Sequence, residues 1–220
     1  MNFHDKTVSS TANGTQQAQD MHTIDQQKQR NHMIAKISIM SAIAFILMYL
    51  EFPVPLMPAF LKFDFSEIPA LLAAFSMGPL AGVIVELVKN LLHLPFSQTM
   101  MVGELANFLI GASFVAAAGL VYQHHKSKQN AIKGMVLGTL TMTLVGALFN
   151  YFINIPFYIN VMGFNLEAIV AMTNQAGNRL VTDLPSLILW VFVPFNIVKG
   201  ALVSLLVSLL YKPLSPLLHR

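Results

Sequence analysis

Four charged side chains lie within segments that are otherwise apolar, and they are the first candidates for function. Glu86 and Lys89 share one such segment, Glu104 lies in a second, and Lys199 interrupts the stretch PFNIVKGALVSLL. A charged side chain at the centre of a bilayer costs roughly 2.5–3.5 kcal/mol on insertion scales, so it usually forms a pair or serves a function. The sequence therefore predicts buried ion pairs, a ligand site, or both.

Amide side chains accompany these charges at helical spacing. Asn196 lies three residues before Lys199, which places both on one face of a helix. Similar spacings recur in the other apolar segments, so each helix carries a polar stripe that we expect to face the interior of a bundle. The other members of these stripes are Asn150 with Asn154, Glu104 with Asn107, and Glu86 with Lys89 and Asn90.

Some of these residues have a structural interpretation. Glu86 and Lys89 can neutralise each other as an internal ion pair. Asn154 lies near Pro156, so we interpret it as joining helices by a hydrogen bond or repairing the broken backbone. These residues are therefore predicted to stabilise the bundle.

Asn150, Asn196 and Lys199 favour a ligand site. They lie in the same half of their two segments, and each segment contains a proline. A membrane pocket with amides, one cation and many Phe and Met side chains suits a planar, amphipathic, largely uncharged molecule. The spacing assigns no individual Phe or Met to the ligand.

Catalytic motifs are absent from the sequence. There is no HExxH, GxSxG, Walker A or aspartate-cluster motif, and no cysteine. The histidines lie in the N-terminal region, in loops, at the end of one apolar segment and at the C-terminus. We therefore expect no enzyme activity, no metal site and no cofactor, and any ATP hydrolysis must come from partner subunits.

The composition is typical of a membrane protein. The chain is 55% hydrophobic and 10% charged, against about 25% charged in soluble domains. Its net charge is +3, and its cations bracket apolar segments without forming a stripe. Nucleic-acid binding is therefore not expected.

The apolar segments predict an all-α, polytopic membrane protein with six transmembrane helices. Residues 1–32 are polar and predicted to be a disordered cytoplasmic tail, 33–212 a substrate-binding membrane domain, and 213–220 a cytoplasmic C-terminal tail. The second and third spans are short and meet at Gly78-Pro79. The predicted spans are Met33–Leu50, about Ile68 to Met77, Pro79 to about Leu94, Met100–Tyr122, Gly134 to about Ile159, and Pro185–Tyr211.

The distribution of Lys and Arg predicts that both termini are cytoplasmic. With that orientation only Lys62 and Arg179 lie on the outer side of the membrane, while Lys89 and Lys199 lie within it. An even number of spans agrees with it. The residues on the inner side are Lys6, Lys28, Arg30, Lys36, Lys126, Lys128, Lys133, Lys212 and Arg220.

Several stretches resemble the substrate-binding S component of energy-coupling-factor (ECF) vitamin transporters, most closely the riboflavin-specific members. The resemblance covers roughly residues 33–212. It rests on the six-span layout, a proline-rich first loop that ends in FLKFDFSEIPALL, and the stretches GPLAGVIVELVKNLLH, GELANFLIGASF, FNYFINIPFY and PFNIVKGALVS.

The resemblance implies a high-affinity riboflavin-binding subunit in a bacterial cell membrane. It implies as partners a membrane coupling subunit and two cytoplasmic ATPase subunits, which dock on small residues of the first span, here Ser38 and Ala42. In the family, amides and a lysine of the last two spans bind the flavin, and the first outer loop covers it. The predicted ligand residues are Asn150, Asn196, Lys199, the loop residues Leu61, Lys62 and Asp64, and Glu104 and Asn107 of the fourth span.

Three alternatives remain open at this stage. The chain could be an S component for another vitamin. A self-sufficient oligomeric channel or secondary carrier is a second alternative, although the two halves show none of the inverted repeats common in such carriers. An intramembrane enzyme is a third, and it lacks a paired nucleophile and base. The connection 160–184 has no assigned role.

Overall fold

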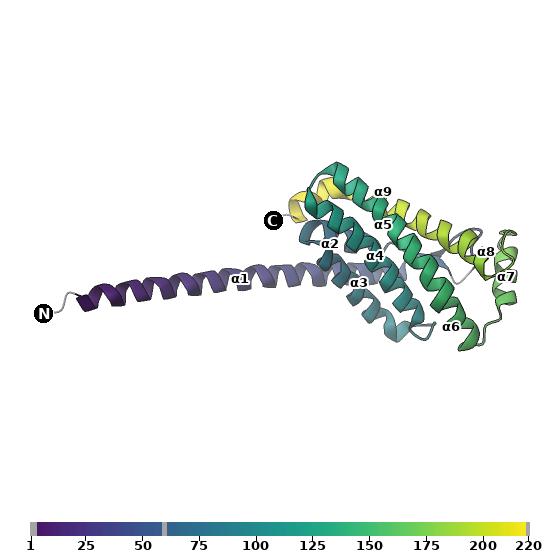
Figure 1. The fold of residues 1–220 in the computed structure, drawn as a ribbon, viewed down its shortest axis with the longest axis horizontal. Coiled ribbons are helices and arrows are strands. Elements are labelled where there is room, and N and C mark those ends of the chain that lie inside the picture. The colour runs from purple at the N-terminus through teal and green to yellow at the C-terminus, as the bar shows by residue number, and fades with distance from the viewer. Residues whose placement is uncertain (1–3, 59–60, 219–220) are drawn as a thin grey trace. The chain divides into compact units, whose positions relative to one another are not determined.

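A computed structural model describes the backbone of residues 4–58 and 61–218 and the side chains of 21–58 and 61–210. Helices dominate this part of the chain (Figure 1). In chain order the elements are α1 (His4–Tyr49), β1 (Phe52–Pro53), β2 (Lys62–Phe63), α2 (Glu67–Met77), α3 (Pro79–His93), the 3-10 helix η1 (Leu94–Phe96), α4 (Val102–His124), α5 (Lys128–Phe149), the π-helix η2 (Asn150–Asn154), α6 (Ile155–Asn160), α7 (Leu166–Gln175), α8 (Leu184–Leu187), the π-helix η3 (Ile188–Phe192) and α9 (Val193–Leu218).

The N-terminal region has a helical backbone in the structure, and the predicted disorder of residues 1–32 stays a prediction. The chain divides into two compact units, Met1–Ser38 and Ile39–Arg220, and α1 begins at His4. No proline occurs before Pro53, and Gln, Lys, Arg and Ala favour helix, so local propensity explains the helical backbone. The domain boundaries at 32/33 and 212/213 stay predictions, and residues 1–3 and 219–220 lie outside the described part.

Five helices of the described chain are long and apolar enough to cross a membrane. They cover the predicted first, third, fourth, fifth and sixth spans. The predicted second span corresponds to α2, which has 11 residues and so extends about 16 Å, half of a bilayer core. Since α2 is buried on nearly every side, its apolar sequence reflects an interior position, and the count of six transmembrane helices is not confirmed. The five candidates are Met21–Tyr49, Pro79–Phe96, Val102–His124, Lys128–Asn160 and Leu184–Leu210.

The break between α2 and α3 lies where the sequence predicts it. Gly78 has a φ of +101° and Pro79 begins the next helix. A residue with a Cβ is strained at this positive φ, while proline is well suited to a first helical turn. The two helices therefore fold back on each other, and they pack closely because Gly82 faces Ala70 and Ala74.

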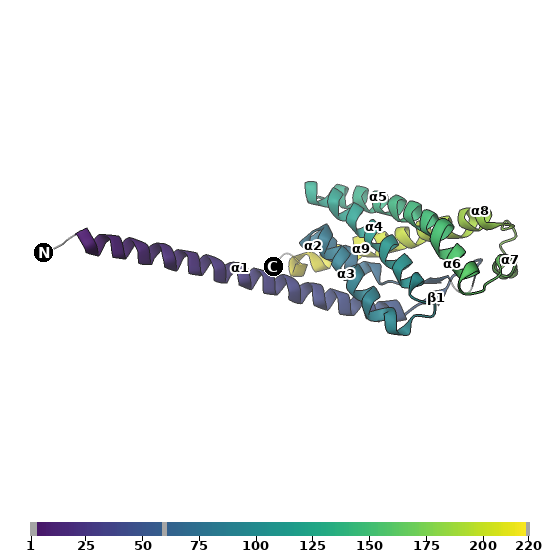
Figure 2. The ribbon, with the colours of Figure 1, turned by 60° about the horizontal axis from the view of Figure 1, so that its bottom comes forward.

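Unit 2 is a bundle in which α3 packs on α4, α4 on α5, and α5 on α9 (Figure 2). Gly134 and Gly138 of α5 lie directly against the backbone of α4 at Ala118 and Phe114. Small residues let helices approach closely, which is the main route to tight packing in a membrane. The C-terminal part of α9 lies at one end of this bundle and α6, α7 and α8 at the other, which we call the loop end (Figures 1 and 2).

Two π-helical segments interrupt the last two spans. Residues Asn150–Asn154 lie between α5 and α6, and Ile188–Phe192 lie between α8 and α9. Pro156 and Pro194 follow these segments by two residues each. A π-bulge widens the helix by one residue per turn and is frequent at functional sites, so both spans are distorted beside the predicted ligand amides.

The polar connection between α6 and α8 is ordered around a small apolar cluster. Ile169 of α7 and Val181 are fully buried against Leu187. Met57 and Leu61 from the first loop pack against the same cluster. The connection 160–184 and the first loop therefore form one structure at the loop end.

Candidate functional site

One cavity of about 610 Å³ lies inside unit 2, within the range of roughly 300–1,000 Å³ found for small-molecule pockets. It is bounded by residues of the first loop, α3, α4, η2 and α9. The structure brings every predicted ligand residue to it. These residues are Leu61, Lys62, Asp64, Glu104, Asn107, Asn150, Asn196 and Lys199.

The amides of Asn150 and Asn196 are fixed by their own helices. Asn150 Nδ2 donates to Gly146 O at 2.8 Å, and Asn196 Nδ2 donates to Phe192 O at 2.8 Å. Both side chains are buried. An amide nitrogen carries two hydrogens, so each residue keeps a second N–H. The hydrogen bond to the helix carbonyl fixes the orientation of the amide before any ligand binds.

Asn154, for which the sequence predicts a packing role, also lines the cavity. Its Nδ2 donates to Asn150 Oδ1 at 2.8 Å. This bond orients the Asn150 amide, because its carbonyl oxygen must face Asn154 and its nitrogen must face Gly146. Asn154 therefore supports Asn150 directly.

Lys199 forms two ion pairs inside the bundle. Its Nζ lies 3.0 Å from Asp64 Oδ2 and 2.9 Å from Glu67 Oε1, and the residue is only 5% exposed. Asp64 comes from the first loop and Glu67 from the start of α2. The lysine is thus electrically neutralised, and one of its three N–H groups stays outside these two pairs.

A second lysine extends this network away from the cavity. Lys89 Nζ lies 2.8 Å from Glu86 Oε2 and 3.4 Å from Glu67 Oε1, and it donates to Ser66 Oγ at 2.6 Å. The predicted Glu86–Lys89 pair is confirmed. Gly111 of α4 makes room for it, because a Cβ there would lie 2.4 Å from Glu86 Oε2.

Asp64 is ionised in this setting. Burial alone would raise the pKa of its carboxyl, but attraction from Lys199 and Lys89 and hydrogen bonds from Ser66 outweigh burial and lower the pKa to about 2. The backbone N–H of Ser66 donates to Asp64 Oδ1 at 2.8 Å. The loop residue therefore carries a fixed negative charge at any physiological pH.

Glu104 occupies a different part of the same cavity. Its Oε1 lies 3.1 Å from His93 Nδ1, and its Oε2 accepts from Ser97 Oγ at 2.6 Å and Thr99 Oγ1 at 3.3 Å. Asn107, one turn along α4, accepts from Asn90 Nδ2 at 3.3 Å. These contacts hold the polar stripes of α3 and α4 toward each other.

The first loop adds Leu61 and Lys62 to the cavity wall. Lys62 pairs with Glu51, and both side chains are exposed. The loop is held in shape by the antiparallel pairing of β1 with β2, in which Phe52 faces Phe63. This end of the cavity is therefore the more solvent-exposed one.

Sequence reasoning missed many cavity residues, among them the polar side chains of Glu67, His93 and Thr99. Glu67 is the last residue of the stretch LKFDFSE and the first residue of α2, so its acidic type in a first turn was a usable signal. His93 and Thr99 flank a polar turn, and nothing in their spacing points to Glu104. The contacts of His93 and Thr99 with Glu104 depend on how α3 and α4 pack against each other.

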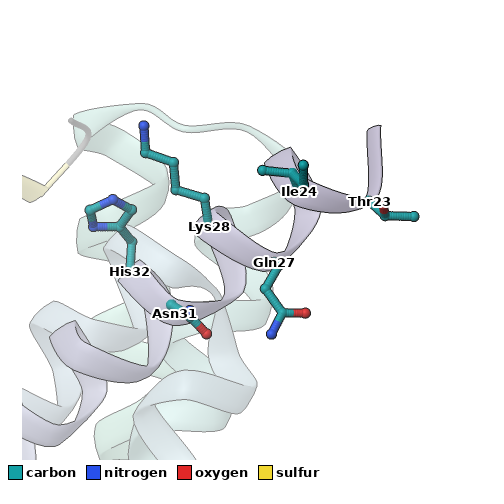
Figure 3. A pocket seen from close by; sticks show the side chains of 6 residues that line it. All are labelled: Thr23, Ile24, Gln27, Lys28, Asn31 and His32. Atoms are coloured by element: carbon teal, nitrogen blue, oxygen red, sulfur yellow. The ribbon is translucent and has the colours of Figure 1, made fainter. Parts of the chain in front are cut away.

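A second, open hollow of about 560 Å³ lies in unit 1, on one helix alone. Figure 3 shows Lys28 and His32 projecting to one side of α1, with Gln27 and Asn31 on another. Because these side chains diverge from a single helix, they form no convergent site.

Comparison with known proteins agrees with this geometry. The family model described as "ECF transporter, substrate-specific component" matches residues 32–211. A protein of Staphylococcus aureus (strain TCH60) named riboflavin transporter RibU is 42% identical over 192 residues, covering 87% of this chain and 95% of the relative. Riboflavin transporter FmnP of Bacillus subtilis (strain 168) is 32% identical over 187 residues, covering 84% and 92%.

A solved structure is also similar. It is described as the S component of a bacterial ECF transporter, and it superposes with a TM-score of 0.67 at 39% identity, covering 87% of this chain and 99% of that one. Sequence and fold thus agree along nearly the whole membrane unit. The chain belongs to the family of substrate-specific components of ECF transporters.

Proposed function

We propose that this chain binds riboflavin and supplies it for uptake to an energy-coupling module that hydrolyses ATP. The convergence of Asn150, Asn196 and Lys199 on one buried cavity carries the proposal. The relatives that are 42% and 32% identical are both named riboflavin transporters, which supports the same substrate. The chain itself is a substrate-binding subunit and not an enzyme.

The polar groups around Lys199, Asn150 and Asn196 suit a neutral heterocycle. Lys199 is neutralised by Asp64 and Glu67, so it offers a ligand one N–H and no net charge. Asn150 and Asn196 each offer a second N–H. The carbonyl and nitrogen acceptors on the polar edge of the isoalloxazine ring match these donors.

The first loop covers the bound ligand. Leu61, Lys62 and Asp64 line the cavity from this loop, and the Asp64–Lys199 pair ties it to α9. Since Leu61 also packs on the apolar cluster of the 160–184 connection, the loop and the connection close the site together.

The membrane arrangement follows from the charge bias. The protein is a multi-pass protein of the cell membrane, and both termini are cytoplasmic because most Lys and Arg residues then lie inside. The partners are a membrane coupling subunit and two ATPase subunits. They dock on α1 at Ser38 and Ala42, and both residues are exposed.

Titration of the purified chain in detergent with riboflavin, thiamine and biotin tests this function. We expect one-to-one binding of riboflavin with quenched flavin fluorescence, and no response to the other two vitamins. A clear thermal shift with another vitamin and none with riboflavin would assign the chain to a sister specificity. Mass spectrometry of small molecules released from the protein provides an independent identification.

A further inference from the structure

Lys89 is a buried cation to which the proposed function gives no role. It is 0% exposed, and the described residues that line the cavity include Glu67 and Lys199 but not Lys89. A buried lysine needs a partner to offset its lost hydration. The ion pair with Glu86 on its own helix would meet that need, yet Lys89 also contacts the start of α2. These additional contacts need a separate explanation.

The additional contacts hold the corner at which the first loop becomes α2. Lys89 Nζ donates to Ser66 Oγ at 2.6 Å and lies 3.4 Å from Glu67 Oε1. The backbone N–H of Ser66 in turn donates to Asp64 Oδ1 at 2.8 Å. All three corner residues are buried. Lys89 therefore anchors to α3 the segment that carries both carboxylate partners of the lysine on α9.

These two carboxylates decide where the Lys199 ammonium group points. Its Nζ lies 3.0 Å from Asp64 Oδ2 and 2.9 Å from Glu67 Oε1. An ammonium group carries three N–H groups, and they are arranged tetrahedrally, so fixing two of them also fixes the direction of the third. Because Lys199 lines the cavity, this third N–H is available to a ligand only while both carboxylates keep their positions.

Glu67 is also a competitor for that third N–H. Its Oε2 is buried and has no hydrogen-bond partner among the described residues, so a rotation of the carboxylate would turn this oxygen toward Lys199. Lys89 opposes the rotation because it attracts the same carboxylate from α3, and charges attract strongly where the surroundings are apolar. The two lysines thus hold Glu67 between them.

We propose that Lys89 is a positioning residue for riboflavin binding, which holds Ser66 and Glu67 so that the third N–H of Lys199 stays directed into the cavity. The proposal rests on the proposed function. It gives the buried ion pairs of α3 a part in ligand binding as well as in stability, although Lys89 itself touches no ligand.

The informative variant combines Lys89→Met with Glu86→Gln. Lys89→Met alone leaves two buried carboxylates without this partner, which destabilises the fold. The combined variant removes one charge of each sign, so the net charge of the buried set stays the same. That set consists of Asp64, Glu67, Glu86, Lys89 and Lys199.

Fluorescence titration with riboflavin on the full chain in detergent tests the proposal. The combined variant should bind riboflavin at least tenfold more weakly than the unmodified protein, with one-to-one stoichiometry retained. Glu86→Gln alone, which leaves Lys89 in contact with Ser66 and Glu67, should stay within threefold. A purely structural role would instead lower the fraction of protein that binds and leave the dissociation constant of that fraction unchanged.

Three results would overturn the proposal while riboflavin binding by the unmodified protein persists. They are an affinity of the combined variant within threefold of the unmodified protein, an equal loss in Glu86→Gln alone, or reduced stoichiometry at an unchanged dissociation constant.

Should the combined variant fail to fold, Ser66→Ala decides, because it removes the 2.6 Å hydrogen bond from Lys89 and keeps every charge. At least threefold weaker binding supports the proposal, and equal binding contradicts it. Absence of riboflavin binding by the unmodified protein would instead contradict the proposed function.

Discussion

Gly146 on α5 and Asn196 on α9 lie so close that a Cβ at position 146 would be 2.7 Å from Asn196 Nδ2. The carbonyl of the same glycine accepts a hydrogen bond from Asn150. One residue without a side chain thus positions two predicted ligand amides from two different spans.

Gly146→Ala should weaken riboflavin binding by about 1–3 kcal/mol, the usual cost of overpacking, because the new methyl group displaces the Asn196 amide. In an Asn196→Ala background the same change should cost almost nothing, since the clashing group is gone. Gly200→Ala, which crowds Thr139 on the same helix pair, is the control. Equal losses from both glycine changes, or additivity with Asn196→Ala, would indicate simple helix separation.

Asn150→Ala and Asn196→Ala should each weaken riboflavin binding by about 1–3 kcal/mol, because a buried partner is left without its hydrogen bond. Asn154→Ala should chiefly lower thermal stability. Titration and thermal unfolding on the same preparations separate the two effects. A larger loss of affinity from Asn154→Ala than from Asn196→Ala would contradict the packing role and show that Asn154, which lines the same cavity, is the more important ligand residue.

Lys199→Met should destabilise the protein by about 3–5 kcal/mol as well as abolish tight binding, since it leaves two buried carboxylates without this partner. Adding Asp64→Asn to Lys199→Met should recover part of the stability but not the affinity. Thermal unfolding measures the stability and riboflavin titration measures the affinity of each variant. Recovery of affinity in the double variant would mean that Lys199 serves only to neutralise Asp64.

The Asp64 pKa of about 2 predicts a pH dependence with a definite sign. The folded pKa lies below the unfolded value near 3.8, so the stability contributed by ionised Asp64 is present above about pH 4 and lost as pH falls toward 2. The difference in melting temperature between the unmodified protein and Asp64→Asn should therefore be constant from pH 8 to pH 5. It should shrink at pH 3, and shrinkage between pH 7 and pH 5 would contradict the assignment.

Ser38→Trp or Ala42→Trp should abolish ATP-dependent uptake and recovery of the complex in a pull-down, because a bulky side chain prevents close helix approach. Riboflavin binding by the isolated subunit should be unchanged. Ile43→Trp, also exposed but on another face of α1, is the matched control and should retain uptake. Loss of riboflavin binding in the Ser38 and Ala42 variants would mean that these residues pack against their own chain.

The sequence predicted several polar residues of the cavity, because polar residues in apolar helices must face inward. Asn150, Asn196, Lys199 and Glu104 all reach the cavity for this reason. Their partners could not be predicted, since Lys199 pairs with Asp64 across 135 residues and no pattern encodes that register. The pairing of Glu67 with two lysines could not be predicted for the same reason, although its position in the first turn of α2 was a usable signal for the residue itself.

Helix lengths were predicted less well than helix positions. The break at Gly78-Pro79 was predicted because both residues have strong backbone preferences. The apolar character of α2 led to a predicted span, since sequence alone does not distinguish a helix surrounded by protein from one surrounded by lipid. The π-segments were not predicted, because one extra residue per turn barely changes the apolar pattern.

The two lysines that pair with Glu67 are synthesised at different times. The ribosome completes Asp64 and Glu67 first, Lys89 soon afterwards, and Lys199 only with the last span. The α2–α3 hairpin can therefore enter the membrane with Glu86 and Lys89 already compensated, while Asp64 still lacks Lys199. The final helix supplies that charge, so a chain without α9 would lack the ion pairs that Lys199 makes with Asp64 and Glu67 and would keep only the Lys89 pairs.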